Sequence, residues 1–407
     1  MKIDFCNLQE VQAKYEEIQN KGYAMDLTRG KPHADQLNLA NDLLSEDKDS
    51  LFNNSIDLRN YGEILGLSDC RKMGSEIIGC SERQVIAGGN SSLTIMYQYL
   101  SSLYFDGSGK QPWSQAERVS IICPVPGFDR HFKLCEMFGM NMISVPLTGS
   151  GPDMDQVEDL IKKDSSIKGI WCVPKHSNPT GETYSTSCVE RLINLPSLAK
   201  GDFKILWDNA YAVHDFKDSE VLPNIFKMAE KQGALDSVIA FASTSKITFA
   251  GGGVGFIAMS EDNLNNFLHH YSAMVIGPDK INQQRHINFF LKSGGIKNHM
   301  LKHADILRPK FECVHEWLLK QEHGTWTQPT GGYFVSFMSK PGLAKKIISL
   351  AAKSGLKLTK AGATYPYGVD PEDRNIRLAP TACSLEELHI AMEVFIVCLS
   401  IATLQIS

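Results

Sequence analysis

The sequence predicts an α/β protein with a large three-layer αβα domain, built on a mainly parallel seven-stranded sheet, and a smaller α+β domain. Seven short apolar segments alternate with longer helical patterns through the middle of the chain, and most of them are continuously hydrophobic. This pattern is typical of strands that helices cover on both faces. Beyond about residue 285 the alternation stops and a long helical pattern begins. With 407 residues, the chain is long enough for two well-filled cores.

The elements follow in order along the chain. The strands of the large sheet are predicted at 84–87, 119–123, 142–147, 169–173, 204–207, 237–242 and 254–259. The small domain is predicted to contain a helical segment at 280–322, strands at 331–337 and 376–378, and a helix at 343–354. The stretch 390–404 is the most hydrophobic, is shorter than a bilayer span, and follows a capping box at 384–387. We therefore expect a buried terminal helix.

The domain organisation follows from these elements. Residues 1–45 precede the first large-domain strand, so we expect them to pack with the small domain. Residues 46–285 should form the large, ligand-binding domain, and residues 286–407 the small C-terminal domain. No internal repeat and no low-complexity tract is visible.

Composition and charge exclude several classes of function. Apolar residues make up 43% and charged residues 21% of the chain, as in an ordinary globular protein. A net charge of −5 without a long Lys/Arg run argues against nucleic acid as a partner. The ten cysteines form no CxxC pair, so we interpret them as small core residues in a reducing compartment and expect no metal. The segment 1–22 lacks an apolar signal core, so cytoplasm is expected, without a membrane partner.

A lysine stands in a small, hydroxyl-rich turn after the predicted strand 237–242. The run 243–255 reads Ser-Thr-Ser-Lys-Ile-Thr-Phe-Ala-Gly-Gly-Gly-Val-Gly, with Lys246 at its centre. Small residues let a bulky group approach the backbone, and hydroxyl groups suit a phosphate. A partly desolvated lysine there would have a lowered pKa and act as an amine nucleophile. A solvated lysine after a strand is the simpler alternative.

Polar residues also follow two neighbouring predicted strands. Asp208 ends the strand 204–207 and is followed three residues later by Tyr211, while Asn178 lies in the Ser-Asn-Pro-Thr-Gly turn after the strand 169–173. Ligands bind at the carboxyl ends of strands in open α/β sheets. A carboxylate at this edge could pair with a protonated pyridine nitrogen. Taken singly, each motif could also be an ordinary turn.

The turn after the first predicted strand has the composition of an anion site. It reads Gly-Gly-Asn-Ser-Ser-Leu at 88–93 and opens a helix that runs to about residue 104. Backbone N–H groups, hydroxyls and the positive end of the helix dipole bind anions there. A plain helix cap is compatible with the same residues.

The joint order of these turns, together with a late arginine, resembles the fold-type I pyridoxal-phosphate aminotransferases of class I/II. The resemblance covers nearly the whole chain, from Leu-Thr-Arg-Gly-Lys-Pro at 27–32 to Arg-Leu-Ala-Pro at 377–380. The runs at 60–62, 126–131 and 277–283 resemble more narrowly the MocR-like subgroup, which includes atypical aspartate aminotransferases. The absence of GxGxxG after the first strand argues against a nucleotide-binding protein.

This resemblance implies a cofactor, pyridoxal 5'-phosphate, and a role for each matching residue. Lys246 would hold it as a Schiff base and carry the substrate proton, and Asp208 would pair with its pyridine nitrogen. Tyr211 and Asn178 would hold the ring oxygen, and Phe128 would stack on the ring. The phosphate-binding residues would be Ser243, Asn90, Ser91 and Ser92.

The resemblance also implies how substrates and a second subunit take part. Arg377 would bind the substrate α-carboxylate as a bidentate fork, with Gly30 and Asn178 beside it. Tyr61 would reach the phosphate of the neighbouring subunit, so a homodimer is expected. One departure from the family is Gly253, which stands where the family usually has a phosphate-binding arginine.

The expected reaction is a ping-pong transfer of an amino group from an L-amino acid to a 2-oxo acid. Aspartate or glutamate is favoured if a second cation reads the side chain. Lys280 is the expected cation, with Arg29, Lys31, Lys175 and Arg285 as alternatives. Other fold-type I activities, such as a β-lyase or a decarboxylase, remain open, as does a non-catalytic cofactor-binding regulator.

Overall fold

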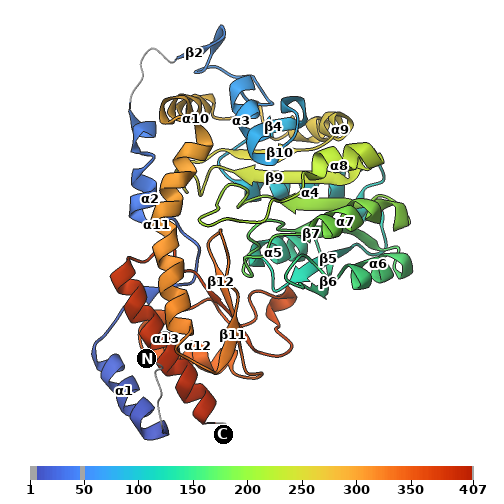
Figure 1. Ribbon diagram of the computed structural model, residues 1–407. Helices are drawn as coiled ribbons and strands as arrows, with labels where there is room; N and C mark the ends of the chain where they lie inside the picture. The colour runs from blue at the N-terminus through green and yellow to red at the C-terminus, as the bar shows by residue number, and fades with distance from the viewer. Residues whose placement is uncertain (1–6, 46–50, 406–407) are drawn as a thin grey trace.

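The computed structural model describes residues 7–45 and 51–405 (Figure 1). Cys6 and the predicted domain boundary at residue 46 lie outside the described residues. The main sheet has seven strands in the order β4-β10-β9-β8-β7-β5-β6. They are β4 (Val85–Ala87), β5 (Ser120–Val125), β6 (Asn141–Pro146), β7 (Ile167–Cys172), β8 (Lys204–Asp208), β9 (Val238–Ser243) and β10 (Gly255–Ala258). The pairs from β9 through β6 are parallel, and β10 runs antiparallel to both of its neighbours.

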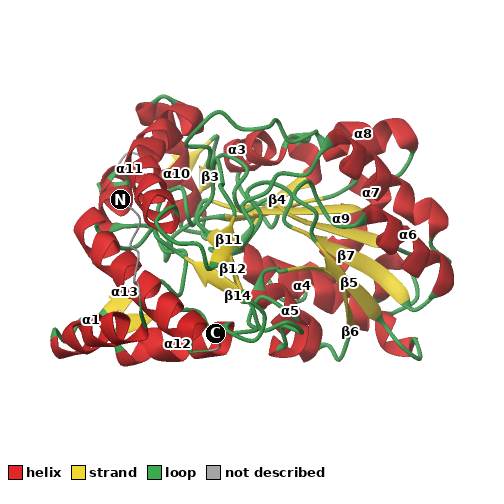
Figure 2. Cartoon of the chain, turned by 60° about the horizontal axis from the view of Figure 1, so that its bottom comes forward, coloured by secondary structure: helices red, strands yellow, loops and turns green. Residues whose placement is uncertain are grey.

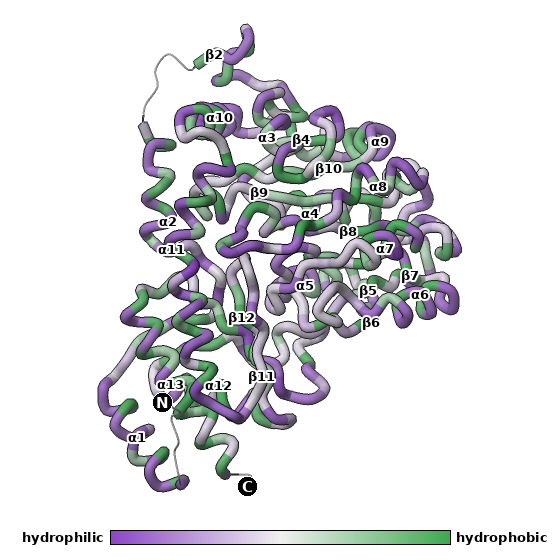
Figure 3. The backbone as a smooth tube through the Cα atoms, in the orientation of Figure 1, coloured by the Kyte–Doolittle hydropathy of each residue, from purple (hydrophilic) through white to green (hydrophobic). Residues whose placement is uncertain are grey.

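The predicted α/β class and all seven predicted strands of this sheet are confirmed. Strands β4, β5 and β8 are buried at every position, as their continuous apolar sequences require. In Figure 3 the central strands β9 and β10 are drawn mostly in the hydrophobic colour, whereas the surrounding helices alternate between hydrophobic and hydrophilic residues. The strands therefore lie between two layers of amphipathic helices (Figure 2).

Two hydrophobic cores cover the two faces of the sheet. One contains residues of α3 (Ser68–Ile78), α6 (Met154–Lys163), α7 (Thr186–Leu198) and α8 (Ile225–Gln232). The other contains residues of α4 (Ser92–Phe105), α5 (Asp129–Met137) and α9 (Glu261–Tyr271). This is the three-layer αβα arrangement that the sequence predicts.

A third core lies beside the large sheet and belongs to the C-terminal part of the chain. It surrounds a three-stranded antiparallel sheet, β11 (Gly324–Trp326), β12 (Val335–Ser339) and β14 (Asn375–Leu378). Its helices are α11 (Gly295–Leu318), α12 (Ala344–Lys353) and α13 (Leu385–Leu404). The exact domain boundaries stay a prediction.

The N-terminal part of the chain lies on this third core. Helix α1 (Leu8–Asn20) packs on α13, where Lys14 Nζ lies 3.1 Å from Glu393 Oε1. Strand β1 (Met25–Asp26) pairs in parallel with β13 (Leu356–Lys357). The remaining elements are α2 (Ala34–Asn38), α10 (Lys280–Ser293), the hairpin β2 (Phe52–Asn53) and β3 (Ile56–Asp57), and 3-10 helices at Asn41–Leu44, Glu82–Gln84, Gly107–Gly109, Trp113–Gln115, Leu235–Ser237 and Pro366–Gly368.

In the C-terminal half the structure changes the bounds of two predicted elements. The helical segment expected at 280–322 is confirmed, and it consists of two helices, α10 and α11, because Gly294 and Gly295 adopt φ angles of 79° and 92°. Glycine adopts this left-handed region without a steric penalty, so the pair ends one helix and begins the next. The strand expected from residue 331 begins only at Val335, because Gly331 and Gly332 instead pack tightly against His176.

The expected terminal helix is confirmed. Ser384 forms the predicted capping box, in which its hydroxyl accepts from Glu387 N and the Glu387 side chain accepts from Ser384 N. Helix α13 is long and apolar enough to cross a membrane by composition, but most of its residues are buried in the third core. The helix therefore serves as the central element of that core.

Candidate active site

The candidate site lies where the carboxyl ends of the parallel strands meet. Asp208 is the last residue of β8, Ser243 is the last residue of β9, and Asn178 lies in the turn that follows β7. Strands β7, β8 and β9 are parallel neighbours, so their carboxyl ends share one edge of the sheet. The structure thus brings together the strand-end residues that the sequence singled out.

Lys246 lies in the turn between β9 and β10, and its ammonium faces Tyr211. Its Nζ is 4.9 Å from the centre of the Tyr211 ring. Burial lowers the pKa of Lys246, and the negative charge of nearby Asp208 raises it in part. The Lys246 carbonyl accepts a hydrogen bond from Tyr333 Oη at 3.3 Å and lies 3.4 Å from His214 Nε2. These contacts hold the lysine backbone, so the side chain starts from a fixed position.

Asp208 has one oxygen held by the protein and one left available. Its side chain is buried, and Oδ2 lies 2.9 Å from Nε2 of His131. The His131 ring stacks on Trp171 with a centroid distance of 4.0 Å and an interplanar angle of 8°. Among the residues that the structure describes, Oδ1 of Asp208 is buried without a hydrogen-bond partner. A buried anionic oxygen of this kind fits a cationic N–H donor from a bound ring.

His131 was not predicted as a site residue, although its place in the sequence carries a signal. Phe128 occupies the N-cap position before α5, and His131 is the third residue of that helix. The two side chains therefore lie one helical turn apart. Their rings lie 5.0 Å apart in a T-shaped arrangement. The residue expected to stack on the cofactor ring and the residue that holds Asp208 therefore come from one turn of helix.

Arg377 enters the site from β14 of the third core. Its side chain is 5% exposed, and its guanidinium lies 4.9 Å from the centre of the Phe334 ring. Nη1 lies 3.2 Å from Asp129 Oδ1 and 3.3 Å from Asn178 Oδ1. Nη2 donates to Thr28 O at 3.1 Å and to Thr359 Oγ1 at 3.3 Å. Asn178 and Arg377 were both expected at the substrate site, whereas Asp129, Thr28, Thr359 and Phe334 were not singled out from the sequence.

The predicted anion site is formed by two turns that touch each other. Asn90, Ser91 and Ser92 lie at the start of α4, and Ser91 makes no side-chain cap bond. Asn90 Nδ2 donates to Gly251 O at 3.3 Å, and Ser245 Oγ donates to Asn90 O at 3.2 Å. The N–H groups and hydroxyls at the start of this helix are suited to a phosphate.

Gly253 lies too close to Ser245 to carry a side chain. A Cβ at Gly253 would lie 2.8–2.9 Å from the backbone nitrogen, Cα and Oγ of Ser245. The chain therefore has no room at Gly253 for the arginine that the family usually has there. The tight packing also places the glycine turn against the turn that carries Lys246.

Two of the predicted residues do not join the others within one chain. Tyr61 is 82% exposed. Lys280 is 3% exposed, and its Nζ donates to Asn60 O at 2.6 Å and to Gly62 O at 3.2 Å. The ammonium of Lys280 thus holds the loop that carries Tyr61, and its role toward a substrate stays a prediction.

The remaining predicted residues have the following positions. A Cβ at Gly30 would lie 2.7 Å from the Phe334 ring, so the Gly30 backbone packs beside the ring that faces Arg377. Arg29 and Lys31 are exposed. Lys175 Nζ lies 2.7 Å from Asp215 Oδ2, so its charge is already paired within the chain.

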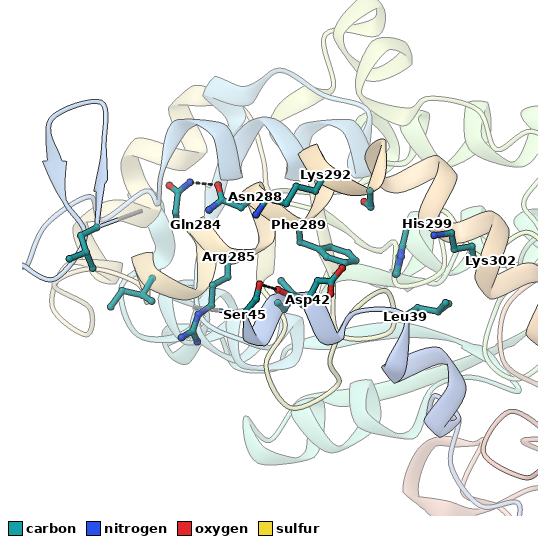
Figure 4. Close-up of a pocket in the computed structure, with 14 residues that line it drawn as sticks. Leu39, Asp42, Ser45, Gln284, Arg285, Asn288, Phe289, Lys292, His299 and Lys302 are labelled. Carbon is teal, nitrogen blue, oxygen red and sulfur yellow. Dashed lines mark hydrogen bonds between the residues drawn. The ribbon is translucent and has the colours of Figure 1, made fainter. Parts of the chain in front are cut away.

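A separate pocket of about 470 Å³ lies between the 3-10 helix at Asn41–Leu44 and helices α10 and α11 (Figure 4). Arg285, another alternative cation, lines this pocket. The pocket touches the lysine turn through His299, whose Nε2 lies 2.7 Å from Ile247 O. None of Lys246, Asp208 or Arg377 lines it, so it is distinct from the candidate site.

The doubly covered sheet and the lysine opposite a strand-end aspartate define a pyridoxal-phosphate-dependent enzyme of fold type I. Sequence comparison agrees with this class: residues 5–406 match the aspartate amino-transferase family. An aspartate aminotransferase of Corynebacterium glutamicum is 43% identical over 404 residues, which cover 97% of this chain and 93% of that protein. The chain belongs to the aspartate amino-transferase family and is a transaminase.

Solved structures agree with this assignment. The crystal structure of an aspartate transaminase from Corynebacterium glutamicum has a TM-score of 0.93 and 41% identity, and the match covers 98% of this chain and 96% of that one. An α-aminoadipate aminotransferase from Thermus thermophilus, solved with N-(5'-phosphopyridoxyl)-L-leucine, has a TM-score of 0.77. At 20% identity over 97% of this chain and 96% of that one, it shows the shared fold.

Pyridoxal 5'-phosphate is therefore the cofactor, and the described residues fit it. The unpartnered Oδ1 of Asp208 is available to the pyridinium N–H, and Lys246 supplies an amine of lowered pKa. The N-terminus of α4 supplies unsatisfied N–H groups for the phosphate.

Proposed function

We propose that the protein transfers the amino group of an L-amino acid, with aspartate or glutamate favoured, to a 2-oxo acid by a ping-pong mechanism. The observation that carries this proposal is the presence at one sheet edge of Lys246, an amine whose pKa burial lowers, and of Asp208, whose Oδ1 is buried without a partner among the described residues. An amine of lowered pKa is neutral in a larger fraction of molecules near pH 7 and so acts as a nucleophile and a base.

Lys246 and Asp208 divide the chemistry between them. The bound cofactor supplies an aldehyde that accepts the amino group and a ring that delocalises negative charge from the substrate Cα. Lys246 Nζ takes the proton from the substrate Cα. It then delivers this proton to the carbon on the other side of the transferred nitrogen. Asp208 keeps the ring nitrogen protonated, and His131 fixes the orientation of that carboxylate.

Arg377 orients the substrate. Its guanidinium binds the α-carboxylate, and a fixed carboxylate aligns the Cα–H bond with Lys246. Asn178 and Tyr211 are proposed to hold the ring oxygen, Phe128 to stack on the ring, and Ser243, Asn90, Ser91 and Ser92 to bind the phosphate. The close approach of Asn178 Oδ1 to Arg377 Nη1, at 3.3 Å, supports a shared site for ring and carboxylate.

The proposed preference for dicarboxylic substrates rests on the named relatives and not on an identified side-chain cation that would bind the second carboxylate. The Corynebacterium glutamicum relative at 43% identity is named an aspartate aminotransferase. Lys280 is occupied by two carbonyl groups within its own chain. Membership of the MocR-like subgroup is likewise a proposal, which rests on the sequence runs at 60–62, 126–131 and 277–283.

We further propose a homodimer with shared sites. Tyr61 is 82% exposed, and Phe52 and Ile276 are 58% and 68% exposed. The Tyr61 loop is nevertheless held firmly, by Lys280 and by the close packing of Gly277 on Gly62. A firmly held loop that presents an exposed aromatic ring is suited to contact a second subunit.

The experiment is a half-reaction followed by absorbance. The cofactor-loaded protein is mixed with one amino acid at a time and no 2-oxo acid, and the near-visible band of the bound cofactor is recorded. Aspartate or glutamate should convert the band completely and release one 2-oxo acid per site, whereas Lys246→Ala should show no such turnover. Release of carbon dioxide, or of a fragment of the side chain, would identify a decarboxylase or a β-lyase and contradict the proposal.

A further inference from the structure

Arg377 has a counter-ion within its own chain. Asp129 Oδ1 lies 3.2 Å from Nη1, and the two side chains are 32% and 5% exposed respectively. Asp129 comes from α5 beside the large sheet, whereas Arg377 comes from β14 of the third core. The pair therefore joins two separately packed parts of the chain at the substrate site.

This pairing conflicts with the binding of a substrate carboxylate. A guanidinium this well buried requires a compensating charge, and in the described chain Asp129 supplies it. If Asp129 kept its position, the incoming α-carboxylate would share Arg377 with a like charge a few ångströms away, which is unfavourable. The other contacts of Arg377, to Asn178, Thr28 and Thr359, are neutral and create no such conflict.

Asp129 has an alternative environment within reach. Its side chain is about one-third exposed, so its carboxylate can turn into water. It is also the first residue of α5, and the preceding Phe128 provides no side-chain cap for that helix. The partial positive charge at the start of the helix stabilises a carboxylate there even when it has left the arginine.

We propose that Asp129 is an exchangeable counter-ion of Arg377, which the α-carboxylate of the substrate displaces. The inference rests on the proposed role of Arg377 as the carboxylate-binding residue. Amino acids and 2-oxo acids both carry this carboxylate, so the exchange weakens the binding of both by the same factor. It also keeps the guanidinium neutralised between the two half-reactions, when neither substrate is bound.

The first test measures carboxylate binding without catalysis. Succinate, which has no amino or oxo group, is titrated into cofactor-loaded protein at constant ionic strength, and the shift in Tm is recorded. Without succinate, Asp129→Asn should unfold at a lower temperature than the wild type. Succinate should stabilise the variant more strongly, with half-saturation at a concentration on the order of three- to tenfold lower. Arg377→Ala should abolish the response in both backgrounds.

Controls and kinetics make the result decisive. Asp305→Asn removes a carboxylate from an exposed pair with Arg308 and should behave as the wild type. Asp129→Ser provides a second neutral side chain should the asparagine variant fold poorly. In steady-state turnover by Asp129→Asn, the KM for the amino acid and the KM for the 2-oxo acid should both fall, with kcat nearly constant. Equal or weaker succinate binding by the variants, or a raised KM, would mean that Asp129 holds Arg377 in place and would overturn the proposal. Because succinate does not react, this result is independent of whether transamination occurs.

Discussion

At the scale of single residues, the site depends on pairs that hold a charge in one orientation. Asp208 is expected to stabilise the protonated ring only if its free oxygen faces that ring, and His131 is its hydrogen-bond partner at 2.9 Å. Trp171 stacks on the imidazole and restricts its rotation. His131 is therefore a positioning residue that acts through Asp208.

We predict that His131→Ala lowers kcat/KM by about 10- to 100-fold, because a hydrogen bond to a charged group is worth about 1.5–3 kcal/mol. The absorbance maximum of the bound cofactor should shift as well, since the protonation of its ring then changes, and a purely structural role for His131 would not cause this shift. The measurements are steady-state kinetics and the absorbance spectrum. The matched control is His389→Ala on α13, which removes the acceptor of the hydrogen bond from the Trp317 indole of α11. Unchanged kinetics and spectrum in His131→Ala would contradict the assigned role.

At the scale of elements, the two turns that are proposed to bind the phosphate have no charged side chain at residue 253. The close approach of Gly253 to Ser245 keeps the lysine turn against the start of α4. A methyl group at Gly253 has no space, whereas at Gly252 the nearest atom lies 3.7 Å away.

We predict that Gly253→Ala weakens cofactor binding by about 10- to 100-fold, because overpacking of a filled site typically costs about 1–3 kcal/mol. Gly252→Ala, one residue earlier in the same turn, should bind the cofactor as the wild type does. Dissociation constants from fluorescence titration of cofactor-free protein provide the comparison. Equal weakening in both variants would show that the flexibility of the turn matters rather than the contact with Ser245.

At the scale of the whole molecule, the proposed dimer combines residues from two chains. Tyr61 lies outside the site of its own subunit and is 82% exposed. If Tyr61 completes the site of the partner, a mixed dimer of Lys246→Ala and Tyr61→Ala subunits carries both defects in one site and leaves the other site intact.

We predict that Lys246→Ala and Tyr61→Ala subunits regain activity when they are unfolded, mixed and refolded together. Random pairing makes about half of the dimers mixed, each with one intact site, so roughly a quarter of wild-type activity should return. A mixture of Lys246→Ala with Asp208→Ala should not recover, because each of these defects disables the site of its own subunit and a mixed dimer then has no intact site. Sedimentation of the mixtures checks that dimers form, and no gain from the first mixture would exclude shared sites.

Much of this architecture is encoded locally. Most of the strands from β4 to β10 could be predicted because their apolar segments are continuous, as in strands that are buried on both faces. Asp208, Asn178 and Lys246 could be singled out because each lies at the end of a strand or in the turn after one, and parallel strands end at one edge. The break between α10 and α11 was also visible in principle, since Gly294 and Gly295 are adjacent.

The sequence by itself thus determined the fold class and the set of residues that carry the proposed chemistry, because periodicity and strand ends are local properties. Only the tertiary structure decided which charges meet. Asp208 and His131 are 77 residues apart, and Arg377 and Asp129 are 248 residues apart. These contacts depend on how separate layers and cores pack together. Packing involves residues from the whole chain, so a local sequence pattern does not specify it.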